Sequence, residues 1–196
     1  MKREIGRFLE CRDAAALVEF SICALAVIML LVGVIEFAML NFSATLLEGG
    51  MREAARYGIT GRDIDSATRT ARIVTIVNEH AGGLFQIDPG DVTTLVYPNF
   101  SDIGQSEPFT DVNGNGDFDP GEPFTDRNCN GDWDVDMGVA GLGAGGEVVL
   151  YTASRDIETI TGLLDPFIAP DGAFTIRATI AVRNEPFRTG QGVCAP

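Results

Sequence analysis

The sequence predicts an α+β fold in which a long N-terminal helix leads into a small antiparallel sheet of three or four strands. Three observations support this prediction: an apolar stretch over residues 14–42, a change after residue 83 from helical spacing to β-branched runs, and an acidic fifteen-residue repeat over residues 107–136. The repeat is expected to project from one edge of the sheet.

The apolar stretch is the longest in the chain and predicts a membrane-spanning helix. Its only charges are Glu19 and Glu36, with sixteen uncharged residues between them. At ~1.5 Å per residue, a helix over residues 14–42 is roughly 43 Å long, enough to cross a hydrocarbon layer of ~30 Å. A removed signal peptide is the alternative. Its apolar core would be only about 7–15 residues long, and the small residues 14–16 stand before the apolar core instead of after it.

Charge placement predicts the orientation of this helix. The residues before it include four bases, which indicates that residues 1–13 form a cytoplasmic basic tip and that the C-terminal part faces outward. These bases are Lys2, Arg3, Arg7 and Arg12. The net charge of −14 argues against nucleic acid as a partner.

The four cysteines divide by compartment under this orientation. Cys11 would be cytoplasmic and Cys23 would lie in the helix, whereas Cys129 and Cys194 would lie outside, where a disulfide can persist. A Cys129–Cys194 disulfide is therefore a candidate, although the sequence alone leaves the pairing open.

Glu19 is the informative residue of the apolar helix, because an acid inside a membrane segment is costly without a partner. One interpretation places it at the lipid–water boundary, where it favours the positive helix N-terminus. The other makes it an assembly charge that pairs with a cation from a neighbouring subunit. Both interpretations stay open at this stage.

A helical stem is expected over residues 43–82. Apolar residues recur at helical spacing to about Tyr57, with a bend allowed at Gly49-Gly50. Asp63 or Asp65 could cap a second helix that ends near residues 81–83.

The remaining residues, 83–196, are expected to form a β-rich head outside the membrane. Residues 91–98, 146–154 and 174–183 have strand composition, and the last alternates apolar and polar side chains. Residues 156–164 favour a short helix between the last two strands, and the glycine-rich residues 138–146 favour a loop.

The first copy of the acidic repeat has the spacing of a calcium-binding loop. Oxygen-bearing side chains occupy positions 1, 3, 5, 7, 9 and 12 of the loop, with Gly116 at position 6. The candidate ligands are Asp111, Asn113, Asn115, Asp117, Asp119 and Glu122. Calcium prefers about six to eight hard oxygens, and alternate residues of a tightly wound loop can supply them.

The second copy repeats this spacing but lacks an acid at position 12, which is Met137. Its candidate ligands are Asp126, Asn128, Asn130, Asp132 and Asp134, with Asp136 as the nearest further acid. Two calcium ions are therefore expected over residues 107–138, with Phe109, Phe118, Phe124 and Trp133 packing the copies against each other and the sheet. The loops lack flanking helices and resemble those of dockerin and thrombospondin repeats. A solvated acidic hairpin without metal is the alternative.

The N-terminal region resembles TadE-like proteins of tight-adherence (Tad/Flp) pilus systems. The matching features are the basic tip, the VEF motif that contains Glu19, the long apolar helix, a second acid with an aromatic at Glu36-Phe37, and the REAARYG stretch over residues 52–58. Residues 174–187 are similar to the closing strand of that family. The acidic repeat has no counterpart in this resemblance and reads as an insertion.

The resemblance implies a pilin-like structural subunit, either a minor pilin or an assembly protein, that is not an enzyme. It assigns assembly roles to Glu19 and Glu36, a single-pass location in the bacterial inner membrane or, after assembly, the extracellular pilus, and pilin or Tad subunits as partners. A prepilin peptidase would cut at Ala14–Ala15, where alanine stands in place of the expected glycine.

The residues themselves also argue against an enzyme. The single histidine, His80, lies near the end of a helical stretch, and neither a nucleophile motif nor a dinucleotide motif is present. The alternative function is a membrane-tethered calcium-binding adhesin or sensor that does not polymerise.

Overall fold

The structure is a computed structural model that describes residues 12–59, 65–159, 161–162 and 173–186. It divides into two compact units, which are described separately. The first comprises residues 1–42 and 158–174, and the second comprises residues 43–157 and 175–196. The fold class is α+β, as the sequence predicts: one long apolar helix, a second helix and a four-stranded antiparallel sheet.

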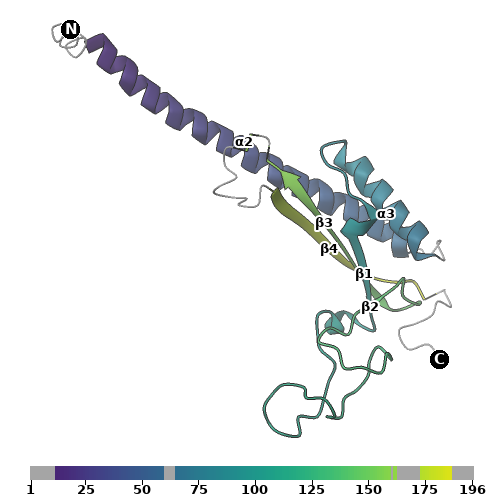
Figure 1. Ribbon diagram of the computed structural model, residues 1–196. Coiled ribbons are helices and arrows are strands. Elements are labelled where there is room, and N and C mark those ends of the chain that lie inside the picture. The colour runs from purple at the N-terminus through teal and green to yellow at the C-terminus, as the bar shows by residue number, and fades with distance from the viewer. Residues whose placement is uncertain (1–11, 60–64, 160, 163–172, 187–196) are drawn as a thin grey trace. The chain divides into compact units, whose positions relative to one another are not determined.

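Helix α2 (Arg12–Ile59) is continuous through both the apolar stretch and the first part of the expected stem (Figure 1). Its N-terminal part lies in the first unit and exposes large apolar side chains in all directions, because no polar face interrupts them. The helix is long and apolar enough to cross a membrane, and almost none of its most apolar window is buried within the chain. A single N-terminal helix of this kind is compatible with a membrane anchor.

The second unit begins with the C-terminal part of α2, which is followed by helix α3 (Ser66–Ala81). Asp65 is the N-cap of α3, since its Oδ2 accepts the backbone N–H of Thr68 at 2.9 Å. Gly82 ends the helix with φ +57°, a left-handed conformation that favours glycine. The two caps confirm the bounds predicted for this helix.

The sheet of the second unit has strand order β2–β1–β3–β4. Its strands are β1 (Val92–Tyr97), β2 (Val139–Ala140), β3 (Val148–Glu158) and β4 (Ala173–Arg183). Strand β1 pairs antiparallel with β2 and with β3. Two short 3-10 turns flank β1, at Pro89–Asp91 and Phe100–Asp102. The three predicted strands are confirmed, and β2 is an added edge strand inside the predicted glycine-rich loop.

The helix predicted over residues 156–164 is wrong in its described part. Residues 156–158 continue strand β3, and residues 161–162 form a bend; residue 160 and residues 163–164 lie outside the described residues. The strand extends because β4 lies beside it: the Asp156 carboxylate accepts the Thr175 hydroxyl at 2.5 Å. Pairing across the sheet thus overrides the local helical preference.

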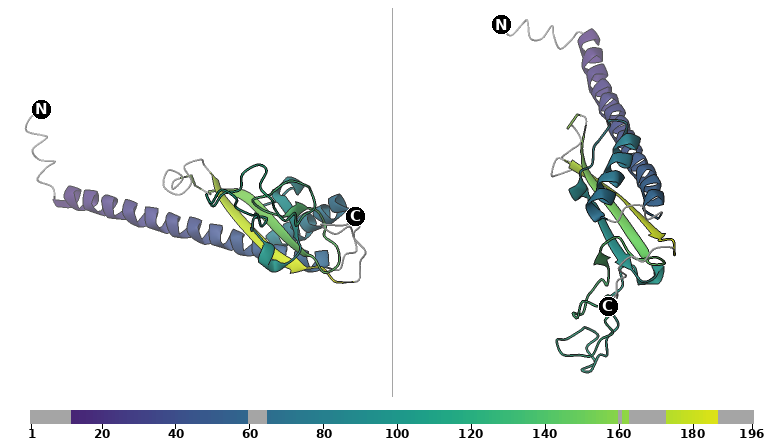
Figure 2. Two further views of the ribbon diagram at one scale, coloured as in Figure 1. Left: turned by 90° about the horizontal axis from the view of Figure 1, so that it is seen from below. Right: turned by 90° about the vertical axis from the view of Figure 1, so that its right-hand side faces the viewer.

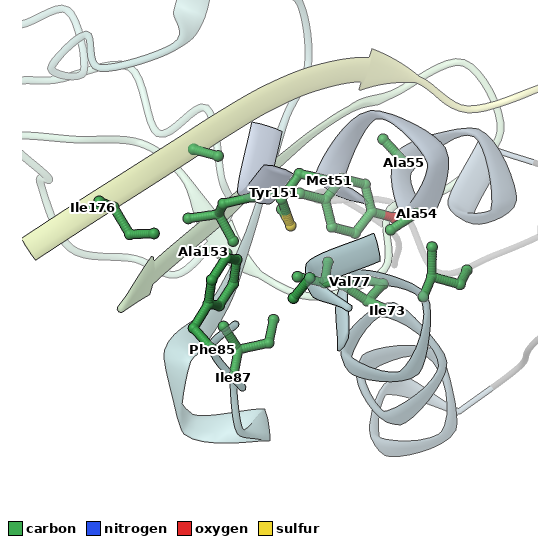
Figure 3. Packing of buried hydrophobic residues seen from close by; sticks show 14 of the residues in the cluster. Met51, Ala54, Ala55, Ile73, Val77, Phe85, Ile87, Tyr151, Ala153 and Ile176 are labelled. Atoms are coloured by element: carbon green, nitrogen blue, oxygen red, sulfur yellow. The ribbon is translucent and has the colours of Figure 1, made fainter. Parts of the chain in front are cut away.

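The core of the second unit lies between the two helices and the sheet, as Figure 3 shows. The C-terminal part of α2 contributes Leu47, Met51, Ala54 and Ala55, which contact apolar residues of α3 and of strands β3 and β4. Those partners include Ile73, Val77, Tyr151, Ala153 and Ile176. Burial of this apolar face holds the stem against the sheet.

Candidate functional site

The acidic repeat follows β1 and precedes β2 in the chain, and it extends past the ends of those strands (Figure 2, right-hand view). Its base is closed by backbone hydrogen bonds, from the Met137 N–H to the Gln105 carbonyl at 3.1 Å and from the Glu107 N–H to the Asp134 carbonyl at 3.0 Å. The sheet therefore holds both ends of the repeat close together, and the loops themselves stand apart from the helices.

The two copies pair with each other through their EPFT segments. The Thr110 N–H donates to the Pro123 carbonyl at 2.8 Å, and the Thr125 N–H donates to the Pro108 carbonyl at 2.8 Å. An antiparallel bridge joins Phe109 to Phe124 between them. The two hydrogen bonds are equivalent after a shift of fifteen residues, and the bridged phenylalanines are themselves fifteen residues apart. The pairing therefore relates the two copies by a local, approximate twofold axis.

The first loop winds around the carboxylate of Asp111. Its Oδ1 accepts the backbone N–H groups of Gly114 and Asn115 at 2.6 and 3.2 Å, and its Oδ2 accepts that of Gly116 at 2.8 Å. The N–H of Gly116 is the largest contribution that lowers the pKa of Asp111 below its usual value. Loop position 1 is thus ionised at neutral pH and fixes the turn.

The second loop repeats this turn around Asp126, which accepts the N–H groups of Cys129 at 2.5 Å and Gly131 at 2.9 Å. Gly116 and Gly131, at loop position 6, both have φ +87°. Position 4 is also left-handed in both loops, and the second copy places Cys129 there with φ +58°. The glycine at position 6 is required by this backbone conformation, as the calcium-loop pattern predicts.

The asparagine and aspartate side chains at positions 3, 5 and 9 converge within each loop. Asn113 and Asn115 both donate from their side-chain amides to Asp119 Oδ2, at 2.5 and 2.8 Å. The second loop has the same arrangement, in which the amides of the two asparagines donate to Asp134 Oδ2 at 2.6 Å each. An amide presents its oxygen in place of its nitrogen after a half-turn about its last torsion, so these side chains can supply oxygens to a shared ion.

The carboxylates at loop position 7 do not join this convergence. Asp117 and Asp132 are exposed, and their backbone N–H groups donate to the preceding asparagine oxygens at 2.8 and 2.7 Å. Within the described ranges, the structure holds no preformed group of three or more His, Cys, Asp or Glu side chains suited to a metal ion. The described side chains of the two loops instead form tight turns and hydrogen-bonded pairs of amide and carboxylate groups.

A glutamate closes each loop. Glu122 Oε1 accepts the Val112 N–H at 2.8 Å, and Glu122 Oε2 accepts the Asp119 N–H at 3.1 Å. In the second loop this place is taken by Glu107, whose Oε1 accepts the N–H groups of Arg127 and Asn128 at 2.6 and 3.2 Å. The sequence reasoning missed Glu107. The available signal was its place in the repeat, where it is the counterpart of Glu122.

Asp136 and Met137, the two residues considered for the end of the second loop, have other roles. The Asp136 carboxylate accepts the Tyr97 hydroxyl at 3.1 Å and the Gly138 N–H at 3.1 Å. Met137 is buried and packs with Tyr97 and Val148. Burial, followed by the hydrogen bond to Asp136, raises the pKa of Tyr97 to about 12. This small cluster anchors the repeat to the sheet.

The four aromatic residues of the repeat form one cluster, which confirms the predicted packing between the copies, while the predicted packing of these residues against the sheet stays a prediction. Phe118 stacks on Trp133 with ring centroids 4.5 Å apart, and Phe109 meets both rings edge-on. Phe124 contacts Phe118 edge-on on the other side. Trp133 also donates from Nε1 to the Glu107 carbonyl at 2.8 Å. The cluster packs the two copies against each other.

Cys129 takes part in a disulfide. Its predicted partner Cys194 lies outside the described residues, as does Cys11, so the Cys129–Cys194 pairing stays a prediction. Cys23 is a free, exposed thiol on α2.

The two acids of the apolar helix lie in different surroundings within the first unit. Glu19 is exposed along with the apolar side chains around it. Glu36 is buried, and its Oε1 accepts both the backbone N–H of Thr161, at 2.9 Å, and the Thr161 hydroxyl. The structure therefore gives Glu36 a partner inside the chain and leaves Glu19 on the outer surface of the helix.

The described residues thus define a protein with one long, apolar, externally exposed helix joined to a small α+β unit that carries a paired acidic repeat. Residues 14–56 match the sequence model of the family described as TadE-like protein. This match lies entirely within α2 and associates the helix with pilin-like proteins of Tad pili. No curated protein and no solved structure matches the chain.

Proposed function

We propose that this chain is a pilin-like structural subunit, either a minor pilin or an assembly protein, of a Tad-type pilus. Its N-terminal helix packs in the membrane or among other subunits, and its second unit stays in water. The role is structural and involves no catalysis. The observation that supports this proposal most strongly is the apolar surface of α2, which coincides with the TadE-like match over residues 14–56.

An apolar surface of this size must be covered by lipid or by other apolar helices. Leu17, Phe20, Leu25 and Leu30 are each more than 60% exposed on the helix, and nothing in the described part of the chain covers them. Glu19 lies on this same surface. A carboxylate there needs a cation, which a neighbouring subunit can supply. Assembly of subunits should therefore require Glu19, whereas insertion of the helix into the membrane should not.

Glu19→Ala tests the proposal in cells whose own copy of the gene is deleted. The variant should still fractionate with the inner membrane, while filaments seen by electron microscopy are lost or strongly reduced. Glu53→Gln is the matched control, because Glu53 is an exposed acid of the same helix in the second unit. Wild-type filament numbers in the Glu19→Ala strain would instead favour a membrane-tethered adhesin or sensor.

We also propose that the acidic repeat binds calcium, with one ion in each loop. Support comes from the paired turns around Asp111 and Asp126 and from the convergence of asparagine and aspartate side chains. Residues 107–136 contain nine acids and one base. The acids would repel one another without a counter-charge, so a bound dication would stabilise this segment.

Calcium binding is measured by titration calorimetry of the full chain in detergent micelles, in chelator-stripped buffer, with magnesium as the matched control ion. Heat corresponding to two ions per chain and a change in Trp133 fluorescence are expected for calcium. Absence of both signals would show that the repeat is an acidic hairpin that binds no calcium.

A further inference from the structure

The second loop has a gap in its own sequence at the position that closes a calcium loop. Position 12 of the first loop is Glu122, whereas position 12 of the second is Met137, which is buried in the cluster with Tyr97. The nearest acid, Asp136, accepts hydrogen bonds from Tyr97 and Gly138. A closing carboxylate for the second loop must therefore come from elsewhere in the chain.

Glu107 stands where that carboxylate is needed. Its backbone N–H donates to the Asp134 carbonyl at 3.0 Å, just as the Glu122 N–H donates to the Asp119 carbonyl at 3.0 Å. Its side chain accepts the N–H of Arg127, and Glu122 accepts that of Val112, the residue fifteen positions earlier. The backbone contact and one side-chain contact of each glutamate therefore match across the local twofold.

The Glu107 carboxylate also has an unused oxygen. Glu107 is 0% exposed, and its Oε2 has no hydrogen-bond partner, although Oε1 accepts two N–H groups of the second loop. A buried carboxylate oxygen without a partner is costly, whereas a cation beside it would remove that cost. This is an observation separate from the acidity of the loop, and it concerns a residue outside the loop.

We propose that Glu107 is the closing ligand of a calcium site in the second loop, so that each copy of the repeat completes the site of the other. Glu122, from the second copy, closes the loop that begins at Asp111. Glu107, from the first copy, closes the loop that begins at Asp126. The inference rests on the calcium binding proposed above and assigns the ligand that the linear sequence of the second loop lacks.

This arrangement couples the two sites. Each closing glutamate stands two residues before one of the paired phenylalanines, Phe109 and Phe124, and the Glu107 carbonyl accepts the indole N–H of Trp133. An ion that orders one glutamate therefore also orders the pairing on which the other loop depends, and the second ion is expected to bind more tightly than the first.

The test compares Glu107→Gln, Glu122→Gln and Asp136→Asn in the full chain in detergent micelles, with calcium alone as the probe. Calorimetry and metal analysis after gel filtration should give one ion for each glutamate variant, and two for wild type and Asp136→Asn. Two ions bound to Glu107→Gln with unchanged affinity would overturn the proposal. A wild type that binds no calcium would instead refute the calcium proposal itself.

Double variants locate the lost ion. Glu107→Gln combined with Asp126→Asn should still bind one ion, because both changes affect the same site, whereas Glu107→Gln combined with Asp111→Asn should bind none. The reverse pattern would overturn the assignment. Thermal unfolding in calcium-free buffer shows whether each variant folds. Should Glu107→Gln fail to fold, Glu107→Asp keeps the charge, and its shorter reach should weaken one site by roughly tenfold or more; unchanged affinity of both sites in that variant would overturn the proposal.

Discussion

Helix α2 contains two regions with different composition and opposite surroundings. Leu25, in the N-terminal part, is 63% exposed, while Leu47, in the C-terminal part, is 0% exposed. The C-terminal part intersperses charged residues such as Glu48 and Arg52 on its outer side, and these leave one apolar face for the core. The N-terminal part has no such division. The comparison shows that the part of the helix with a single apolar face packs on its own chain, whereas the part that is apolar all round needs an external cover.

The largest expected difference between the two parts is in the stability of the second unit. Leu47→Ala removes a fully buried side chain and should lower the free energy of unfolding by about 2–5 kcal/mol. Leu25→Ala is the matched control and should leave that free energy unchanged. Equilibrium denaturation in detergent micelles, followed by circular dichroism, measures both. Equal losses in the two variants would contradict the division of the helix.

Membrane insertion should respond in the opposite way. Leu25→Arg places a charge in the apolar part and should disfavour insertion by about 2.5–3.5 kcal/mol. Glu53→Arg, on the exposed side of the C-terminal part, should insert normally. Alkaline extraction of membranes from expressing cells separates inserted from peripheral protein. Full retention of Leu25→Arg in the membrane pellet would argue against this part as the spanning segment.

The glycine pair of α2 offers a finer test of the packed part. A Cβ on Gly50 would lie 3.0 Å from the Val77 Cα of helix α3, whereas a Cβ on Gly49 would meet nothing within 4 Å. Gly50→Ala should therefore destabilise the second unit by about 1–3 kcal/mol through overpacking. Gly49→Ala should be stabilising by about 0.5–1 kcal/mol, because alanine is the better helix former. Thermal unfolding of the two single variants distinguishes the close approach from simple helix propensity.

The smallest expected effect concerns the cap of α3. The backbone N–H of Thr68 lowers the pKa of Asp65 below its usual value, so the folded state binds this proton less readily than the unfolded state. The stability that the charged cap contributes is therefore present above about pH 4 and lost as the pH falls below it. The melting temperature of wild type should exceed that of Asp65→Ala at pH 6, and the difference should shrink towards pH 3. Asp65→Asn, which keeps a capping oxygen without a charge, should show no such change.

Much of this fold could be predicted from local patterns. The long helix, the Asp65 and Gly82 caps and the three principal strands follow from apolar spacing and from glycine and aspartate placement. The misassigned helix after residue 156 shows the limit of that approach, because pairing between β3 and β4 decides the conformation there.

The candidate site divides in the same way. The turns around Asp111 and Asp126 could be predicted, since each is built within twelve residues of its own sequence. The position of Glu107 could not, because it depends on pairing between the copies. The burial of Glu36 against Thr161 is likewise a contact between residues 125 positions apart, which no periodicity contains.

The pairing of the two EPFT segments has a consequence for how such a repeat can change in evolution. If the first glutamate closes the last loop, the number of copies is fixed at two by geometry. A third copy inserted between them would separate the first and last copies of the repeat. Deletion of either copy would leave the remaining loop without its closing carboxylate. Duplications and losses in this segment should therefore be tolerated only when the hairpin is gained or lost as a whole.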